Sequence, residues 1–125
     1  MKKRTGVRRS VGNRGSYVPD SGDLVWLSFS PQAGREQAGR RPGLVLSPRL
    51  YNTRAGLCLV CPVTSRAKGY PFEVKLPGGQ DVQGVILCDD IKSADWQAQQ
   101  IEWAGQAPPE VVQQVRAKLK PLVGI

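Results

Sequence analysis

The hydrophobic positions of this chain fall in short runs that alternate with turn-forming residues. Glycine, proline and asparagine separate the runs, which lie at residues 24–29, 43–46, 57–64, 72–76, 82–88 and 100–103. Their length and β-branched content predict strands of an antiparallel sheet. Strands this numerous in so short a chain must curl to protect their edges. The pattern therefore predicts a mainly β fold of the α+β class, built as a small bent antiparallel β-barrel.

The last segment of the chain changes its period. Pro108 and Pro109 open it, as prolines often open a helix. The apolar residues that follow recur every three or four positions, at Val111, Val115, Leu119 and Leu122. This spacing predicts an amphipathic C-terminal helix that packs on the sheet. A short helical turn is also expected between Asp89 and Trp96.

A basic segment stands apart at the start of the chain. Residues 1–16 hold six lysines and arginines and no acid, whereas residues 17–125 hold 12 basic and 10 acidic residues, a balance of only +2. Residues 1–16 have little apolar content to offset their ordering entropy, so a disordered basic arm is expected before one domain over residues 17–125. The arm could strengthen binding to any polyanion by counterion release, or it could have no function.

The sequence argues against a secreted or membrane protein. No apolar stretch follows the basic N-terminus, and no apolar run approaches the length of a membrane span. Three cysteines without a disulfide-rich pattern fit a reducing cytosol, so a cytoplasmic location is expected. Cys58 and Cys61 are three apart in a predicted strand, so their sulfurs should point to opposite faces. They are expected to be core residues and not a redox pair or zinc ligands.

Candidate chemistry gathers where the apolar runs end. The first feature is a polar loop with Glu36, Arg40 and Arg41, which Pro42 should end in extended backbone. A carboxylate beside guanidiniums suits phosphate chemistry, although a salt-bridged surface turn would look the same. The other two features are a hydroxyl pair followed by basic residues and an acidic pair, namely Thr64 and Ser65 with Arg66 and Lys68, and Asp89 with Asp90.

The residue types limit which reaction these features could perform. The chain has no histidine, which excludes a serine-type triad and imidazole catalysis of RNA cleavage. Asp89 and Asp90 are adjacent, so their carboxylates should diverge in a strand, and no metal or other cofactor is expected. What remains is metal-free transesterification by the 2′-hydroxyl of RNA. Glu36 is then the available base, Arg41 the stabilising charge and Thr64 a hydrogen-bond donor to a phosphate oxygen.

Longer motifs resemble the MazF/PemK family of toxins from bacterial type II toxin–antitoxin systems. They are residues 17–26 (Tyr17 to Trp26), 36–42, 45–48, Tyr51-Asn52, Thr64 and 68–74, which stand in family order and at family spacing. The resemblance runs from about Tyr17 through the C-terminal helix. It implies the SH3-like bent barrel of the CcdB and MazF toxins, assembled as a homodimer.

The resemblance also implies an activity. Family members are sequence-specific, metal-independent and ribosome-independent endoribonucleases, or mRNA interferases, that cut single-stranded mRNA and so inhibit translation. Their products carry a 2′,3′-cyclic phosphate and a 5′-hydroxyl. The partners implied are single-stranded RNA and an antitoxin with an acidic disordered tail, which would compete with RNA because both are extended polyanions.

The family's functional residues map onto this chain by position. The catalytic arginine matches Arg41, the loop glutamate Glu36 and the active-site threonine Thr64. In some members an aspartate after the fifth strand acts as base, and that position is Asp89, so the base is either Glu36 or Asp89. The RNA-binding residues expected around these positions are Arg35, Arg40, Ser65 and Lys68.

Two departures and one alternative remain. Arg40 stands where the best-known member has histidine, and the segment at residues 77–80 differs slightly in length. The RNA recognition sequence does not transfer, because the loops that read it vary across the family. The alternative function is a non-catalytic or gyrase-directed binding module on the same toxin fold.

Overall fold

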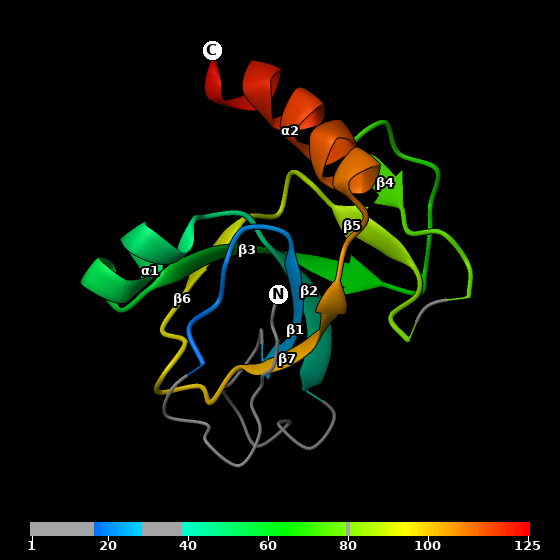
Figure 1. The fold of residues 1–125 in the computed structure, drawn as a ribbon. Helices are drawn as coiled ribbons and strands as arrows, with labels where there is room; N and C mark the ends of the chain where they lie inside the picture. Colours follow the sequence, from blue (N-terminus) through cyan, green and yellow to red (C-terminus); the bar gives the residue numbers. More distant parts are fainter. Residues whose placement is uncertain (1–16, 29–38, 80) are drawn as a thin grey trace.

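A long central strand organises the sheet. The computed structural model describes residues 17–28, 39–79 and 81–125 (Figure 1). Its strands are β1 (Asp23–Ser28), β2 (Arg40–Val45), β3 (Cys58–Thr64), β4 (Glu73–Lys75), β5 (Val85–Leu87), β6 (Lys92–Ala94) and β7 (Glu102–Gln106). The helices are α1 (Arg49–Ala55), between β2 and β3, and α2 (Pro109–Val123), at the C-terminus. The strand order is β4-β5-β3-β2-β1-β7, with β6 paired separately to β3.

Every strand pair is antiparallel, and the predicted α+β class is confirmed. Over the described residues the sheet is open, with β4 and β7 at its two ends. One side of β3 is shared by two partners, because β6 pairs with residues 58–60 and β5 pairs with Val63 and Thr64. This exchange of partners lets the short strands bend around β3 without closing a barrel.

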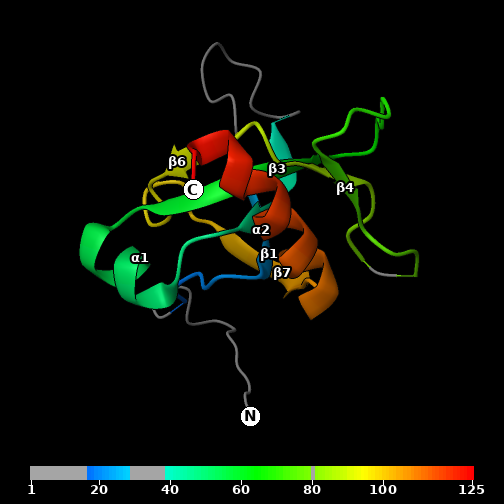
Figure 2. The ribbon, with the colours of Figure 1, turned by 90° about the horizontal axis from the view of Figure 1, so that it is seen from above.

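Apolar side chains pack on both faces of the sheet, as the alternation along its strands requires. One cluster contains Leu24, Leu44, Cys61 and Ile86 and is covered by α2 (Figure 2). The other cluster, on the opposite face, contains residues such as Val25, Val45, Cys58, Val60 and Trp96. Cys58 and Cys61 belong to different clusters, which confirms that their sulfurs lie on opposite faces of β3.

Helix α2 follows the predicted period. Val111 and Val115 are buried against the sheet, and Leu119 packs at the edge of the same cluster. Leu122 is 41% exposed, because the last turn of the helix extends past the sheet. Gly124 then ends the helix with φ of 80°, the left-handed conformation that glycine favours.

Two elements differ from the sequence-based prediction. Helix α1 was not predicted, because Asn52 is its only buried residue and no apolar period marks it. The helical turn expected between Asp89 and Trp96 is wrong, since β6 occupies Lys92–Ala94 and pairs with β3. Turn residues do follow, from Trp96 to Gln100. Backbone pairing with β3 outweighs local preference in this short polar stretch.

No helix in the described ranges is both long enough and apolar enough to span a bilayer. The predicted basic arm, residues 1–16, lies outside the described residues. So do Arg35 and Glu36, two of the expected site residues.

Candidate active site

A pocket of about 440 Å³ opens where β2 begins and β3 ends. We call it the Arg41 pocket. Strand β2 contributes two of its lining residues, β3 and the turn after it contribute four, and the β4–β5 loop contributes one: Arg41, Pro42, Val63, Thr64, Ser65, Arg66 and Gln83. A pocket of this size falls in the range of small-ligand sites.

Strand register brings Arg41 and Thr64 together. Gly43 of β2 pairs with Pro62 of β3, and Leu44 pairs with Cys61. Continuing this antiparallel register by two residues sets Arg41 opposite Thr64, on the same face of the sheet. Directly opposed residues have Cβ atoms about 5 Å apart. The two residues that the sequence analysis joined only through chemistry are therefore neighbours across two strands.

The Thr64 hydroxyl is oriented by the turn that follows it. The backbone N–H of Arg66 donates a hydrogen bond to Thr64 Oγ1, at 3.1 Å. Because the oxygen accepts this bond, the hydroxyl proton remains available to donate to a ligand. Thr64 can therefore give a hydrogen bond into the pocket, where phosphate oxygens would accept it.

The pocket is cationic over the described residues. Its lining includes the guanidiniums of Arg41 and Arg66 and no carboxylate. The ion pairs of the described residues join Arg40 to Glu102, Arg49 to Asp20 and Lys92 to Asp90. Neither Arg41 nor Arg66 takes part in them. Two unneutralised positive charges on one pocket favour an anionic ligand, and a guanidinium fork matches phosphate oxygens.

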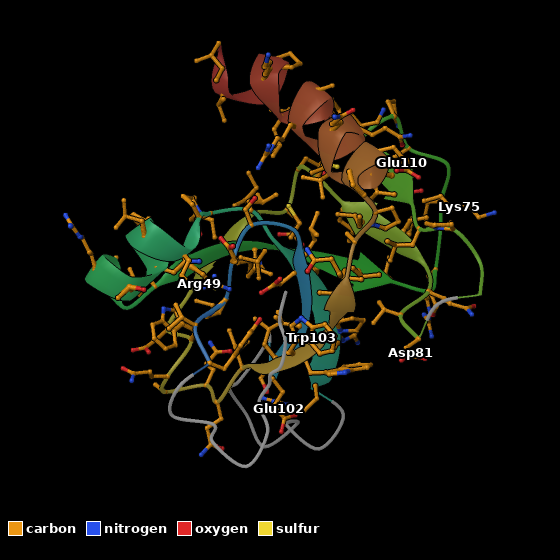
Figure 3. The ribbon with its side chains drawn as sticks, viewed as in Figure 1. Arg49, Lys75, Asp81, Glu102, Trp103 and Glu110 are labelled. Carbon is orange, nitrogen blue, oxygen red and sulfur yellow. The ribbon has the colours of Figure 1, made fainter. Side chains whose placement is uncertain are left out.

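Arg40 is not among the residues that line the Arg41 pocket. Its guanidinium donates hydrogen bonds to the carbonyl oxygens of Gln99 and Gln100, each at 3.0 Å. It also contacts the carboxylate of Glu102, the first residue of β7, at 3.4 Å (Glu102 is labelled in Figure 3). The structure uses this arginine to hold the turn that leads into β7.

Lys68 and Ser65 have different surroundings. Ser65 lines the pocket, as expected for a residue next to Thr64. Lys68 does not line it. The backbone N–H of Lys68 donates to both oxygens of Glu73, at 3.2 and 3.1 Å, and its ammonium lies 5.9 Å from the centre of the Tyr70 ring. Lys68 thus belongs to the β3–β4 loop beyond the pocket.

Asp89 is exposed and separated from the pocket by the direction of β5. Val85 pairs with Thr64, and β5 then runs away from the pocket because the strands are antiparallel. β5 ends at Leu87, and Asp89 follows in the turn after it. Asp89 is not among the residues that line the Arg41 pocket.

Sequence reasoning missed Gln83 and Gly84. Gly84 has φ of 124°, and a Cβ placed there would lie 2.3 Å from the Thr64 carbonyl oxygen. Only glycine allows the two backbones to approach this closely, so Gly84 sets the position of Thr64. A single glycine directly before the apolar run that starts at Val85 was a usable signal for such an approach. Gln83 carried no signal in the sequence.

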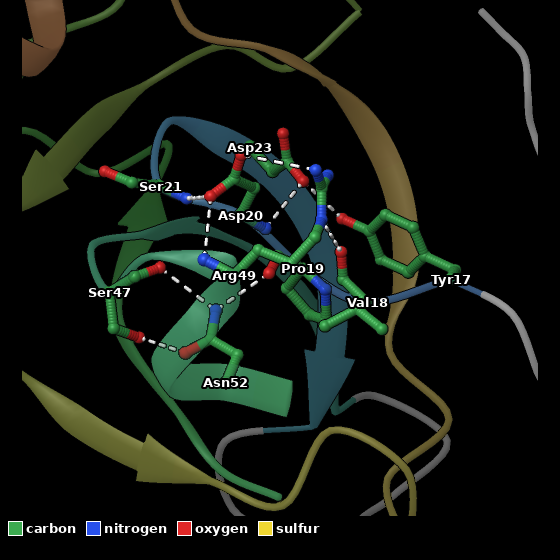
Figure 4. A network of polar contacts seen from close by, with 9 residues as sticks. All are labelled: Tyr17, Val18, Pro19, Asp20, Ser21, Asp23, Ser47, Arg49 and Asn52. Carbon is green, nitrogen blue, oxygen red and sulfur yellow. Dashed lines mark hydrogen bonds and ion pairs between the residues drawn. The ribbon is translucent and has the colours of Figure 1, made fainter. Parts of the chain in front are cut away.

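The first resembling motif builds structure away from the pocket, because Arg41 pairs with Leu27 whereas Asp23 begins β1. Asp23 is 95% buried, and its Oδ2 accepts hydrogen bonds from the Tyr17 hydroxyl at 2.8 Å and the Asp20 N–H at 2.9 Å (Figure 4). Burial raises the pKa of the Asp23 carboxyl above its ordinary value, and it raises the pKa of Tyr17 as well. This pair anchors the chain as it enters β1.

Asn52 joins three segments through its side chain and carbonyl. It is fully buried, and its Oδ1 accepts a hydrogen bond from Ser47 Oγ at 2.6 Å. Its amide donates to the carbonyl oxygens of Pro19, at 2.8 Å, and Ser47, at 3.0 Å (Figure 4). The Trp96 indole N–H donates to the Asn52 carbonyl at 2.9 Å. The motif residues Ser47 and Asn52 therefore hold α1 against the sheet.

The cysteines do not supply a nucleophile. All three are buried, and burial raises the pKa of Cys58 and Cys61 to about 12 and that of Cys88 to about 11. Buried thiols with raised pKa values are unreactive. Within the described ranges, no three histidine, cysteine, aspartate or glutamate residues gather in a group that could hold a metal ion.

The fold and the pocket define a small α+β protein that presents a cationic, hydroxyl-lined pocket at the edge of a bent sheet. Residues 20–123 match the family of PemK-like, MazF-like toxins of type II toxin–antitoxin systems. The chain belongs to this family, and the family assignment made from its motifs is confirmed.

Relatives of known name and structure agree with this membership. Over 108 residues the chain is 50% identical to the endoribonuclease toxin MazF of Escherichia coli (strain K12), covering 86% of this chain and 96% of that protein. The crystal structure of MazF from Deinococcus radiodurans is 58% identical with a TM-score of 0.79, covering 87% and 99% of the two chains. A MazE–MazF crystal structure from the same organism contains a chain 56% identical with a TM-score of 0.80, again covering 87% and 99%.

Proposed function

We propose that this protein is an endoribonuclease toxin that cleaves single-stranded mRNA and thereby inhibits translation. The observation that carries the proposal is the meeting of Arg41 and Thr64 in one cationic pocket. The 50% identity to the E. coli endoribonuclease toxin MazF supports it, because that relative is covered almost end to end. Cleavage of cellular mRNA would require a cytoplasmic location.

The reaction we propose is transesterification within the RNA. The 2′-hydroxyl attacks the neighbouring phosphorus, and the bond to the 5′-oxygen breaks. The Arg41 guanidinium stabilises the charge of the phosphorane, and the Thr64 hydroxyl donates to one of its oxygens. The products would carry a 2′,3′-cyclic phosphate and a 5′-hydroxyl. Arg41 supplies the fixed positive charge that a metal ion supplies in other nucleases, so the proposal includes metal-independent cleavage.

The general base in this proposal is Glu36. The other candidate, Asp89, does not line the Arg41 pocket, and β5 runs away from Thr64 before the turn that carries Asp89. Glu36 is five residues before Arg41 in the sequence.

The partners we propose are an antitoxin and a second copy of the chain. The D. radiodurans relative has been crystallised as a MazE–MazF complex, which supports an antitoxin of the same type here. An acidic extended segment of that antitoxin would be attracted to the Arg41 pocket by the same two charges that favour RNA. The proposal of a homodimer is supported by exposed aliphatic side chains at the end of α2, at Leu122, Val123 and Ile125.

The test is cleavage of a long single-stranded RNA in excess EDTA by wild type and by Arg41→Ala. Wild type should make discrete cuts with cyclic-phosphate ends. The variant should be slower by roughly 100- to 1000-fold, the scale for loss of one charge-stabilising group. Arg54→Ala is the matched control, because Arg54 is exposed on α1, away from the pocket (Figure 1). Its cleavage rate should equal that of wild type.

Three outcomes would contradict the proposal. Normal cleavage by Arg41→Ala would remove Arg41 from the mechanism. An absence of cleavage by the wild type, with the protein folded, would leave a non-catalytic or gyrase-directed binding module. Cleavage that returned only with Mg²⁺ would contradict the metal-independent step and point to the acids near Asp89.

A further inference from the structure

The Arg41 pocket contains a second guanidinium that the proposed reaction does not use. We infer that Arg66 is a substrate-binding residue that holds the phosphate of a nucleotide next to the cut, while Arg41 serves the phosphate that reacts. The inference rests on the proposed function, since it concerns the RNA substrate of that same pocket.

The position of Arg66 is fixed by Thr64. The backbone N–H of Arg66 donates a hydrogen bond to Thr64 Oγ1 at 3.1 Å. This bond closes the turn after β3 and keeps Arg66 among the residues that line the pocket. Arg41 instead comes from β2, the strand paired with β3, and lies opposite Thr64 on the same face of the sheet. The two guanidiniums therefore approach the pocket from different segments. Thr64 lines the same pocket as both of them. An RNA strand lying over Thr64 would meet both arginines.

The side chain of Arg66 has no structural task among the described residues. Arg40 holds the turn before β7, Arg49 contacts the Val18 carbonyl and Asp20, and Arg116 donates to the Ser21 hydroxyl. The described residues offer the Arg66 guanidinium no such partner. An exposed charge without an internal partner is free to bind a ligand.

The charge of the pocket points to more than one phosphate. A single phosphodiester carries one negative charge, and Arg41 alone would neutralise it. Among the described residues, the lining holds two guanidiniums and no carboxylate, which matches two successive phosphates of one strand. A contact to a neighbouring phosphate adds affinity in the ground state and the transition state alike. Its loss should therefore raise KM and leave kcat nearly unchanged.

The test compares Arg66→Gln with Arg54→Gln, each of which removes one exposed charge. Gln retains a polar side chain, and the backbone bond to Thr64 does not depend on the side chain at position 66. Binding is measured with a mixed-sequence 2′-O-methyl oligoribonucleotide, which cannot be cut because it lacks the 2′-hydroxyl. Arg66→Gln should bind roughly 10-fold more weakly, and the slope of log K against log salt should become shallower by about 0.7, the value for one phosphate on a single strand.

Cleavage kinetics provide the second measurement. Arg66→Gln should raise KM roughly 10-fold with little change in kcat, whereas Arg41→Ala should lower kcat. Arg66→Lys should restore most of the salt slope, because it restores the charge without the fork. Thermal unfolding of each variant checks that the fold is intact.

The outcomes separate this inference from the proposed function. If wild type cleaves RNA but Arg66→Gln and Arg54→Gln have the same KM and the same salt slope, the inference is overturned and the proposed function stands. A fall in kcat for Arg66→Gln would also overturn it, since Arg66 would then act on the reacting phosphate. If wild type does not cleave but Arg66→Gln still makes the salt slope shallower, the proposed function fails while the phosphate contact stands.

Discussion

At the scale of single residues, the pocket depends on a glycine that takes no part in the chemistry. Gly84 lies so close to the Thr64 carbonyl that any side chain would displace the backbone carrying Thr64 and Ser65. Thr64 in turn presents a hydroxyl whose oxygen is already occupied by the Arg66 N–H. The placement of Thr64 is thus decided by a backbone contact between the end of β3 and the β4–β5 loop, which are distant in sequence.

Replacement of Gly84 by alanine should impair both stability and cleavage. The substitution combines a strained backbone at φ of 124° with a Cβ 2.3 Å from the Thr64 carbonyl oxygen. We expect a loss of about 3 kcal/mol in the free energy of unfolding, measured with urea, and a marked fall in the cleavage rate. Gly79→Ala is the control, because Gly79 has φ of 85° and a Cβ added there would meet no atom within 4 Å.

The comparison of the two glycines separates strain from collision. Gly79→Ala should show only the smaller loss due to its backbone conformation and should cleave normally. Equal stability and equal cleavage for the two variants would mean that the close approach of Gly84 to Thr64 does not support the pocket.

At the scale of elements, short segments follow contacts more than local pattern. Strand β6 forms because its backbone pairs with β3, although only Ala94 of its residues is buried. Helix α1 forms around a single buried polar residue, Asn52. Pro62 lies in the middle of β3, paired with Gly43, where the other side of the strand passes from β6 to β5. A proline is tolerated there because the ladder on that side is interrupted.

Asn52→Ala should strongly destabilise the protein. It would leave Ser47 Oγ and the Pro19 and Ser47 carbonyls without their hydrogen bonds to the Asn52 side chain in a buried site. We expect the free energy of unfolding to fall by about 3 kcal/mol, as for a broken buried network. Thr53→Ala, an exposed change on the same helix, should have little effect. A similar urea midpoint for both variants would show that the network contributes little stability.

The elements that the sequence predicted well are those whose apolar periodicity is strong. β1 and β3 are short, nearly continuous runs of buried side chains, and α2 buries Val111 and Val115 one turn apart, so the pattern of hydrophobic positions marks them. α1 and β6 bury one residue each, so no pattern could mark them. For the site, chemistry and family motifs singled out Arg41 and Thr64, but Arg40 looked equivalent to Arg41. Only the contacts in the folded protein show that Arg40 faces the turn before β7.

At the scale of the whole molecule, the exposed end of α2 is the feature that a single chain leaves unexplained. Val123 is 58% exposed and Ile125 84% exposed, beside Leu122. The last turn of α2 lies away from the sheet that buries the first half of the helix (Figure 1). In the homodimer we propose, the second copy would cover these side chains.

Light scattering after gel filtration should therefore give twice the chain mass of 13.6 kDa for wild type. Leu122→Lys should shift the protein toward the monomer, because a charge would be buried in the interface. Gln113→Lys adds the same charge to an exposed position in the first half of α2 and should leave the dimer intact. A Leu122→Lys protein that remained dimeric at micromolar concentration would exclude the end of α2 from the interface.

The sequence by itself determined the fold class and the family, and it singled out Arg41 and Thr64 as candidates. Those properties follow from the pattern of buried positions and from the order of motifs, which are local or linear along the chain. Tertiary structure decided which arginine lines the pocket, which glycine holds Thr64 in place and that Asp89 is not among the lining residues. Register and the approach of distant segments set those positions, and such contacts exist only once the strands have paired.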